Sequence, residues 1–135
     1  HAADPALRIG LVQNPILSPQ SAQAAKVMLA VQRKLGAAAA WGFYRTLLSK
    51  PGRIDGPGAL TAAAALGIAQ ADIEEIADSE EVRLALKSQM RMAADLGLYA
   101  TPSYVLGNSG ILGHPGANAM AKMIASTRRC DRLAC

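Results

Sequence analysis

Aromatic side chains are scarce in this sequence, and their scarcity limits the kind of core that the chain can build. Aromatic residues make up 4 % of the 135 positions, whereas 51 % are hydrophobic and many of these are alanine. Such a core must come from aliphatic side chains and close helix contacts, and alanine is the best helix former. The composition therefore favours a largely helical chain. Its length suits a single domain, because two independent cores would need more residues.

Long hydrophobic runs are also missing. A helix that crosses a bilayer needs about 18 to 20 consecutive apolar residues. Charged residues interrupt each of the best candidates, and these are Lys26, Arg33, Arg45 and Lys87. Residues 1–5 offer neither the basic start nor the apolar run of a cleavable signal peptide. We therefore expect no membrane insertion and no signal peptide within the chain.

Cysteine occurs only near the end of the chain, as Cys130 and Cys135. This placement is not typical of a disulfide-stapled scaffold or of a zinc site, so we expect no metal ion. In a continuous helix, an offset of five residues would separate the two Cα atoms by about 8 to 9 Å, beyond the roughly 7 Å limit for a disulfide. A bridge between them would therefore require the tail to unwind.

Positive charge is in excess but is not concentrated. The formal net charge is +4 and the pI is near 9.4. Basic residues are spread singly along the helical segments, and only Arg128, Arg129 and Arg132 cluster. Cations near a helix C-terminus complement the helix dipole, so the cluster indicates a solvated helix end. We expect no nucleic-acid partner; a DNA-binding protein would also explain the pI, but it would show strongly salt-dependent binding.

The hydrophobic pattern predicts one α/β domain with a helical insertion. Residues 7–16 mix β-branched and aliphatic side chains before a proline, which predicts a strand. Helical spacing follows over about residues 18–97. Aromatic and β-branched residues then predict a hairpin over about 98–113, with its turn at 108–110, and a last helix over about 117–128. A sheet whose strands are separated by a long helical stretch is best explained as an interrupted sheet domain.

Cap signals divide the helical insertion into separate helices. Ser18 before Pro19 predicts the start of the first helix, and Gly36 predicts its end. Further helices are predicted over residues 37–50, 59–66 and 70–77. Ser79, followed by two acidic residues, predicts one more helix, which continues until Gly97.

Four short segments carry a resemblance to a known family. Residues 14–22 read NPILSPQSA before an alanine-rich helix, residues 41–44 read WGFY, residues 97–105 read GLYATPSYV, and residues 113–116 read GHPG. In this order they resemble landmarks in the later part of DsbA-like thioredoxin-fold domains, a bacterial class of thiol-disulfide oxidoreductases. The third segment is similar to the family's Gly-x-x-Gly-Thr-Pro-x-Phe motif. Tyr44 stands where the resemblance leads us to expect histidine.

The resemblance implies a substrate-binding segment. In this family the Thr-Pro bond is cis, so a cis bond is implied between Thr101 and Pro102. Such a bond would expose backbone groups of the preceding residue to an extended substrate. The implied substrate-binding residues are Ala100, Thr101 and Pro102, with a protein or peptide as the partner. Tyr99 and Tyr104 would shape the surface beside them.

His114 is the only histidine inside the implied fold. A proton shuttle or a ligand would be its functional interpretation. Because no acidic residue or cysteine lies next to it in the sequence, we interpret it as structural.

The resemblance lacks one part of the family's fold, the opening strand and the first helix. In the family that helix starts with a Cys-x-x-Cys, where the helix dipole makes a thiolate available. Cys130 and Cys135 match neither this spacing nor this place, so we assign no catalytic residue and expect no cofactor. The missing strand is central to a thioredoxin sheet, and its loss would leave two unpaired edges. We therefore expect a thioredoxin-like fold that is incomplete at the N-terminus: either a fragment of a longer protein, or a homodimer in which a second copy completes the sheet.

Three functions stay open at this point. The leading hypothesis is a part of a DsbA-like oxidoreductase that acts on exported proteins, periplasmic or secreted, with its dithiol before residue 1. The alternative is a redox-inactive thioredoxin-like module that keeps the groove as a peptide-binding or scaffold surface. A glutathione-dependent isomerase or transferase on the same fold is the third. A Cys-x-x-Cys within about thirty residues upstream would favour the first hypothesis.

Overall fold

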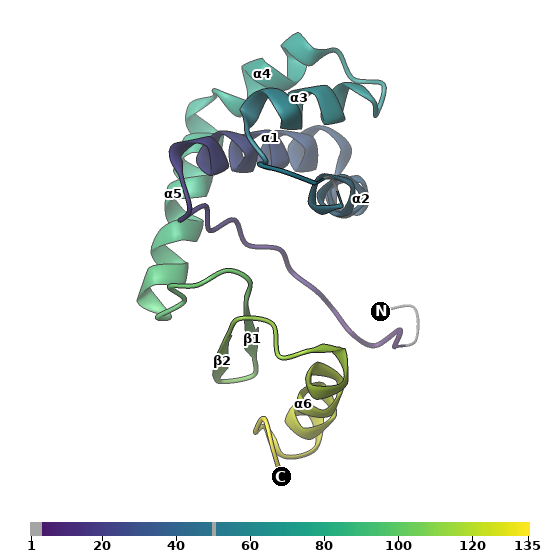
Figure 1. Cartoon of the computed structure of the whole chain (residues 1–135), viewed down its shortest axis with the longest axis vertical. Helices are drawn as coiled ribbons and strands as arrows, with labels where there is room; N and C mark the ends of the chain where they lie inside the picture. The colour runs from purple at the N-terminus through teal and green to yellow at the C-terminus, as the bar shows by residue number, and fades with distance from the viewer. Residues whose placement is uncertain (1–3, 50) are drawn as a thin grey trace.

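A helical body and a small hairpin unit make up the molecule, which we describe from a computed structural model covering residues 4–49 and 51–135. The body consists of α1 (Pro19–Leu35), α2 (Ala37–Leu48), α3 (Gly56–Ala64), α4 (Gln70–Ala77) and α5 (Glu80–Asp95). The hairpin unit consists of β1 (Ser103–Leu106), β2 (Ser109–Leu112) and α6 (Ala117–Cys130). Helix α5 extends from the body toward the hairpin, and α6 lies at the far end beside the C-terminus (Figure 1).

Side-chain caps start the two longest helices where the sequence predicts them. The Ser18 hydroxyl accepts a hydrogen bond from the Ser21 amide at 3.2 Å, and Pro19 occupies the first turn of α1. The Ser79 hydroxyl accepts from the Val82 amide at 3.3 Å and starts α5 in the same way. Each cap satisfies an amide that has no partner within its helix. Gly36, with a φ of 84°, then ends α1.

Several predicted helix boundaries differ from the structure: α3 ends at Ala64 instead of residue 66, and α6 continues to Cys130 instead of about residue 128. Helix α3 starts at Gly56 instead of residue 59, because the Asp55 carboxylate accepts a hydrogen bond from the Gly58 amide at 2.9 Å and Pro57 fits the first turn. Helix α2 ends at Leu48, where the Ser49 hydroxyl donates to the Arg45 carbonyl at 2.7 Å. The end predicted at Lys50 lies outside the described residues.

Helix α1 is the centre of the body, since it packs against α2, α3, α4 and α5. The largest fully buried side chains are Val31, Phe43, Ile73 and Val82. Most other core positions are alanines, among them Ala30, Ala59 and Ala63 with no exposed surface at all. Small side chains let helix backbones approach closely, which is how an aromatic-poor sequence fills its core. None of the described helices is both long and apolar enough to cross a membrane.

The strand predicted over residues 7–16 is wrong. The segment is extended, but it pairs with no other strand, because the only strand pairing among the described residues is that between β1 and β2. A strand is defined by its ladder to a neighbour, and the local sequence cannot supply one. In Figure 1 the segment crosses from near the N-terminal end of the chain to α1 without running beside the hairpin.

Side-chain contacts hold this extended segment in place. The backbone amide of Gln13 donates to the side-chain oxygen of Gln89 in α5 at 2.7 Å, and the side-chain amide of Asn14 donates to the Leu98 carbonyl at 3.0 Å. Asp4 forms an ion pair of 2.6 Å with Arg128 of α6. The segment is therefore tied both to the helical body and to the hairpin unit.

The chain reverses direction at the end of α6. Asp131 has a left-handed φ of 55°. A disulfide joins Cys130, the residue before it, to Cys135, with a Cα–Cα distance of 6.5 Å. The helix has therefore ended before Cys135, which is the unwinding that a bridge requires.

We expect Phe43→Ala to lower the free energy of unfolding by about 3–5 kcal/mol, because it removes the largest buried ring and leaves a cavity. Leu48→Ala, on the same helix but 57 % exposed, is the control, and we expect it to cost about 0.5 kcal/mol or less. Urea unfolding followed by circular dichroism measures both. Equal costs for the two variants would show that α2 does not pack as described.

The Asp4–Arg128 pair predicts a pH dependence. The hydrogen bond from Arg128 lowers the pKa of Asp4 below its ordinary value. A lowered carboxyl pKa contributes stability that is fully present above the pKa of the unfolded chain and is lost as the pH falls through the folded value. We expect Arg128→Gln to be less stable than the wild type at pH 7 and the difference to shrink below pH 4, as measured by unfolding at each pH. Lys122→Gln, on the same helix, serves as the control for charge, and a difference that stays constant with pH would contradict the assignment.

Candidate peptide-binding edge

The segment between α5 and β1 begins at a well-defined helix end. Gly97 has a φ of 68°, its amide donates to the Ala94 carbonyl at 2.9 Å, and the Leu98 amide donates to the Ala93 carbonyl at 2.8 Å. This pair of bonds is a Schellman motif, which satisfies carbonyls that the helix leaves open. The motif fixes the direction in which residues 98–102 leave α5.

The three residues predicted to bind substrate follow at once. The Thr101–Pro102 peptide bond is cis, the geometry that the resemblance implies. Ala100 is half-buried, and its carbonyl accepts a hydrogen bond from the Ser103 hydroxyl at 2.5 Å. Thr101 and Pro102 are exposed. Within the described chain, the backbone amide and carbonyl of Thr101 make no hydrogen bond.

The hairpin register decides which backbone groups face outward. Ser103 lies opposite Leu112, and the Gly113 amide donates to the Pro102 carbonyl at 2.9 Å. In an antiparallel pair, residues alternate between bonding to the partner strand and pointing away from it. Pro102, Tyr104 and Leu106 therefore face β2, whereas the backbone groups of Thr101, Ser103 and Val105 point away. We call these last three residues the open edge; no described strand pairs with it.

The turn of the hairpin is shifted by one residue from its predicted place. It consists of Gly107 and Asn108, so Ser109 already belongs to β2. Gly107 adopts a φ of 55°, and a Cβ atom there would lie 2.6 Å from the Asp131 carboxylate. The Asn108 side chain donates to the same carboxylate at 3.1 Å. The turn is thus in contact with the end of α6, which is remote in sequence.

Aromatic side chains lie near the open edge. The Tyr104 hydroxyl and His114 Nδ1 form a hydrogen bond of 2.9 Å, so His114 has a structural partner. Burial raises the pKa of Tyr44 in α2, and the neighbouring Tyr104 raises it further. Tyr99, which was predicted to shape the surface, is 78 % exposed. The pairing of Tyr104 with His114 across the hairpin was not predicted, because neither residue alone signals it.

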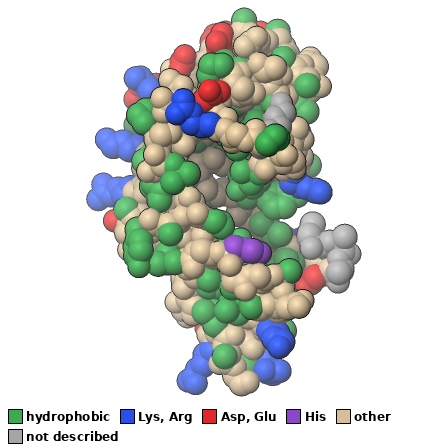
Figure 2. All heavy atoms as spheres, viewed as in Figure 1, with side chains coloured by type: hydrophobic (Ala, Val, Ile, Leu, Met, Phe, Trp, Pro, Cys, Tyr) green, Lys and Arg blue, Asp and Glu red, His purple; other side chains and the backbone are tan. Residues whose placement is uncertain are grey.

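Hydrophobic surface adjoins the edge. A hollow of about 300 Å³ is lined by residues before and within the hairpin, including Leu96, Leu98 and Val105. Figure 2 shows a second depression between the helical body and the hairpin unit, with hydrophobic side chains on its rim. Exposed apolar groups beside unpaired strand groups are what an extended peptide requires.

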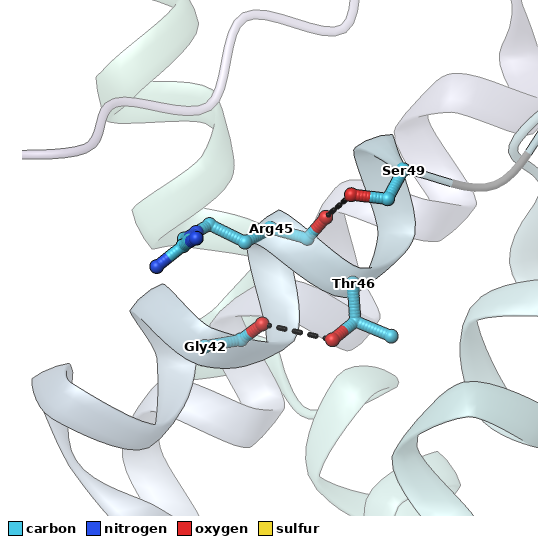
Figure 3. Close-up of a pocket in the computed structure, with 4 residues that line it drawn as sticks. All are labelled: Gly42, Arg45, Thr46 and Ser49. Atoms are coloured by element: carbon cyan, nitrogen blue, oxygen red, sulfur yellow. Dashed lines mark hydrogen bonds between the residues drawn. The ribbon is translucent and has the colours of Figure 1, made fainter.

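A larger surface pocket of about 480 Å³ lies on α2 and is lined by Gly42, Arg45, Thr46 and Ser49. Its hydroxyls already donate to helix carbonyls, Thr46 to Gly42 at 3.1 Å and Ser49 to Arg45 at 2.7 Å. The Arg45 side chain extends away from both hydroxyls (Figure 3). No acid, cysteine or histidine is among the described residues that line this pocket, so its two hydroxyls have no proton-accepting side chain beside them there, and the open edge is the better candidate site.

Comparison with known proteins identifies the family to which the fold belongs. The family model of the DSBA-like thioredoxin domain matches residues 3–125. The chain belongs to this family. Its fold is accordingly α/β and thioredoxin-like, as the sequence predicted.

A solved structure supports the same fold for this DSBA-like domain. The crystal structure of a thioredoxin-like oxidoreductase from Silicibacter pomeroyi DSS-3 matches with a TM-score of 0.85 and 24 % sequence identity. The match covers 96 % of this chain and 73 % of that one. No curated protein matches.

We expect Gly107→Ala to destabilise the DSBA-like domain, because alanine at a left-handed φ costs about 1–2 kcal/mol and its methyl group would meet Asp131. Gly42→Ala is the matched control, since the residue is inside α2 and, apart from its neighbours in the helix, no described atom lies within 4 Å of the added methyl group. We expect the control to stabilise the protein by about 0.5–1 kcal/mol. Chemical unfolding of the three proteins gives both values; the same sign for both substitutions would contradict the turn geometry.

Proposed function

We propose that this chain is the substrate-binding part of a DsbA-like thiol-disulfide oxidoreductase that acts on exported proteins, and that its redox dithiol lies in residues outside these 135. The observation that supports the proposal best is the exposed backbone of Thr101 beside the cis bond to Pro102, because its amide and carbonyl make no hydrogen bond in the described chain. Ser103 and Val105, farther along the open edge, are where the family's central strand would pair in the intact oxidoreductase. An extended polypeptide can pair with such an edge through main-chain hydrogen bonds. In this proposal Ala100, Thr101 and Pro102 hold the substrate backbone beside the dithiol.

The family's chemistry requires a thiolate at a helix start, and no Cys-x-x-Cys is present in this sequence. A redox-inactive peptide-binding or scaffold module is therefore the second candidate. It uses the same open edge and needs no dithiol. The amino-acid sequence immediately upstream distinguishes the two, since a Cys-x-x-Cys there favours the enzyme.

We further propose that the protein works in an oxidising compartment, either the periplasm or the extracellular space. DsbA-like proteins are typical of the periplasm, and disulfides such as Cys130–Cys135 persist in oxidising compartments and are rare in the cytosol. Exported proteins would then be the polypeptides that reach the open edge.

A second copy of the chain is a further partner that we propose for this edge. An unpaired strand edge is a template for pairing with another chain, and two copies could complete each other's sheet. Light scattering of the isolated chain tests this: we expect a dimer whose dissociation is promoted by Val105→Pro, and a monomer at all concentrations would contradict it.

Peptide binding tests the open edge directly. We expect an eight-residue, cysteine-free peptide of alternating valine and threonine to shift the NMR amide signals of Thr101, Ser103 and Val105 on titration. Val105→Pro removes one outward-facing amide, and proline is tolerated on an open edge. Losing one hydrogen bond of about 0.5–1.5 kcal/mol should weaken binding about 2- to 10-fold.

Val105→Ala is the control, since it keeps the amide and should bind nearly as well as the wild type. Signal shifts confined to the α2 pocket, or equal affinity in the proline and alanine variants, would overturn the binding role. Insulin reduction tests the missing dithiol: we expect no catalytic turnover from this chain. Normal turnover that is lost in a Cys130→Ser, Cys135→Ser double variant would place the dithiol in the tail and refute the proposal.

A further inference from the structure

The disulfide at the end of the chain has an uneven environment. Cys135 is exposed and Cys130 is half-buried at the last position of α6. The Arg129 guanidinium lies against Cys135 alone: its Nε and Nη2 atoms are both 3.3 Å from the Cys135 sulfur. Nη2 is also 3.4 Å from the main-chain oxygen of the same residue. A cation at this distance stabilises a thiolate on Cys135 whenever the disulfide opens.

The other sulfur faces the opposite kind of group. The Cys130 sulfur lies 3.3 Å from the Ser126 carbonyl oxygen, and the Cys135 sulfur is farther from it, at 3.7 Å. These are contacts and not hydrogen bonds, because the sulfurs of a disulfide carry no hydrogen. Once reduced, a Cys130 thiol can donate to this carbonyl, which favours its protonated form. The negative end of the α6 dipole acts in the same direction.

Among the described residues, the side chains of the other charged groups around the loop have no contact with either sulfur. Arg128 pairs with Asp4, and the Asp131 carboxylate accepts from Asn108. The Arg132 side chain makes no hydrogen bond to either sulfur in the part of the chain that the structure describes, although its carbonyl oxygen lies 3.9 Å from the Cys130 sulfur. Arg129 is thus the one cation in contact with a sulfur among the described residues.

We propose that Cys130–Cys135 is a thiol-exchange site that reacts with small monothiols of the glutathione type, separate from the open edge and independent of the function proposed above. The thiolate of the monothiol attacks the Cys130 sulfur and forms a mixed disulfide there. The Cys130–Cys135 bond breaks, and its electron pair leaves on Cys135 beside Arg129. A second monothiol thiolate then attacks the sulfur of the first, and Cys130 leaves and takes a proton from water. Two monothiols are oxidised to their disulfide, while the protein disulfide is reduced to two cysteines.

The position of the mixed disulfide tests the direction of attack. The full chain is incubated with reduced glutathione, treated after short times with N-ethylmaleimide to block free thiols, and digested with trypsin at neutral pH. Cleavage after Arg129 and Arg132 places Cys130 and Cys135 on different peptides. We expect glutathione on the Cys130 peptide in mass spectra of the early time points. Glutathione predominantly on Cys135, or no reaction of the folded chain under conditions in which the urea-unfolded chain reacts, would overturn the proposal.

Arg129→Gln tests the role of the cation, with Arg132→Gln as the control of equal charge in the same loop. Arg129→Gln removes the cation that stabilises the departing Cys135 thiolate, so we expect the exchange to be about 3-fold slower in this variant. The Arg132→Gln rate should equal that of the wild type. Circular dichroism confirms that both variants are folded, and equal rates in two folded variants would overturn the role of Arg129. Should Arg129→Gln not fold, the site of glutathione addition in the wild type still decides the proposal.

Discussion

The hydrogen bond from the Gly113 amide to the Pro102 carbonyl fixes the register of the hairpin, and the interpretation of the site depends on it. With this bond in place, alternate residues of β1 face β2, and the backbone groups of Thr101, Ser103 and Val105 face outward. A slip of one residue would exchange the two sets and would turn the side chains to the opposite faces. The Schellman end of α5 on one side and the Gly107–Asn108 turn on the other hold the register from both directions. The open edge is thus a product of backbone geometry more than of any one side chain.

The parts of the fold that were predicted correctly are those specified by neighbouring residues. Ser18 with Pro19, Ser79, and Gly36 define helix ends through contacts three or four positions away, and α1 and α5 start where those signals stand. The Thr101–Pro102 motif led to the family and to the segment beside the open edge. Such local patterns can be recognised in a single sequence, because the residues that form the hydrogen bonds are close together along the chain.

What the sequence did not disclose depends on contacts between distant residues. Residues 7–16 have strand-like composition, but a strand needs a partner, and the described chain provides none for them. The turn begins one residue earlier than predicted, at Gly107, whose contact with Asp131 only the folded chain creates. The Tyr104–His114 bond and the contact of Arg129 with Cys135 likewise join groups whose proximity only the folded chain creates. Periodicity carries no information about such pairs.

The contact between Gly107 and Asp131 also links two positions in evolution. A Cβ atom at position 107 would lie 2.6 Å from the carboxylate that accepts the Asn108 bond, so a relative that loses this glycine has to move or replace the side chain at 131. Asp131 is itself the left-handed residue that starts the disulfide loop. Substitutions at these sites should therefore appear together in related sequences, and a mismatched pair would mark a domain whose hairpin tip and α6 end are arranged differently.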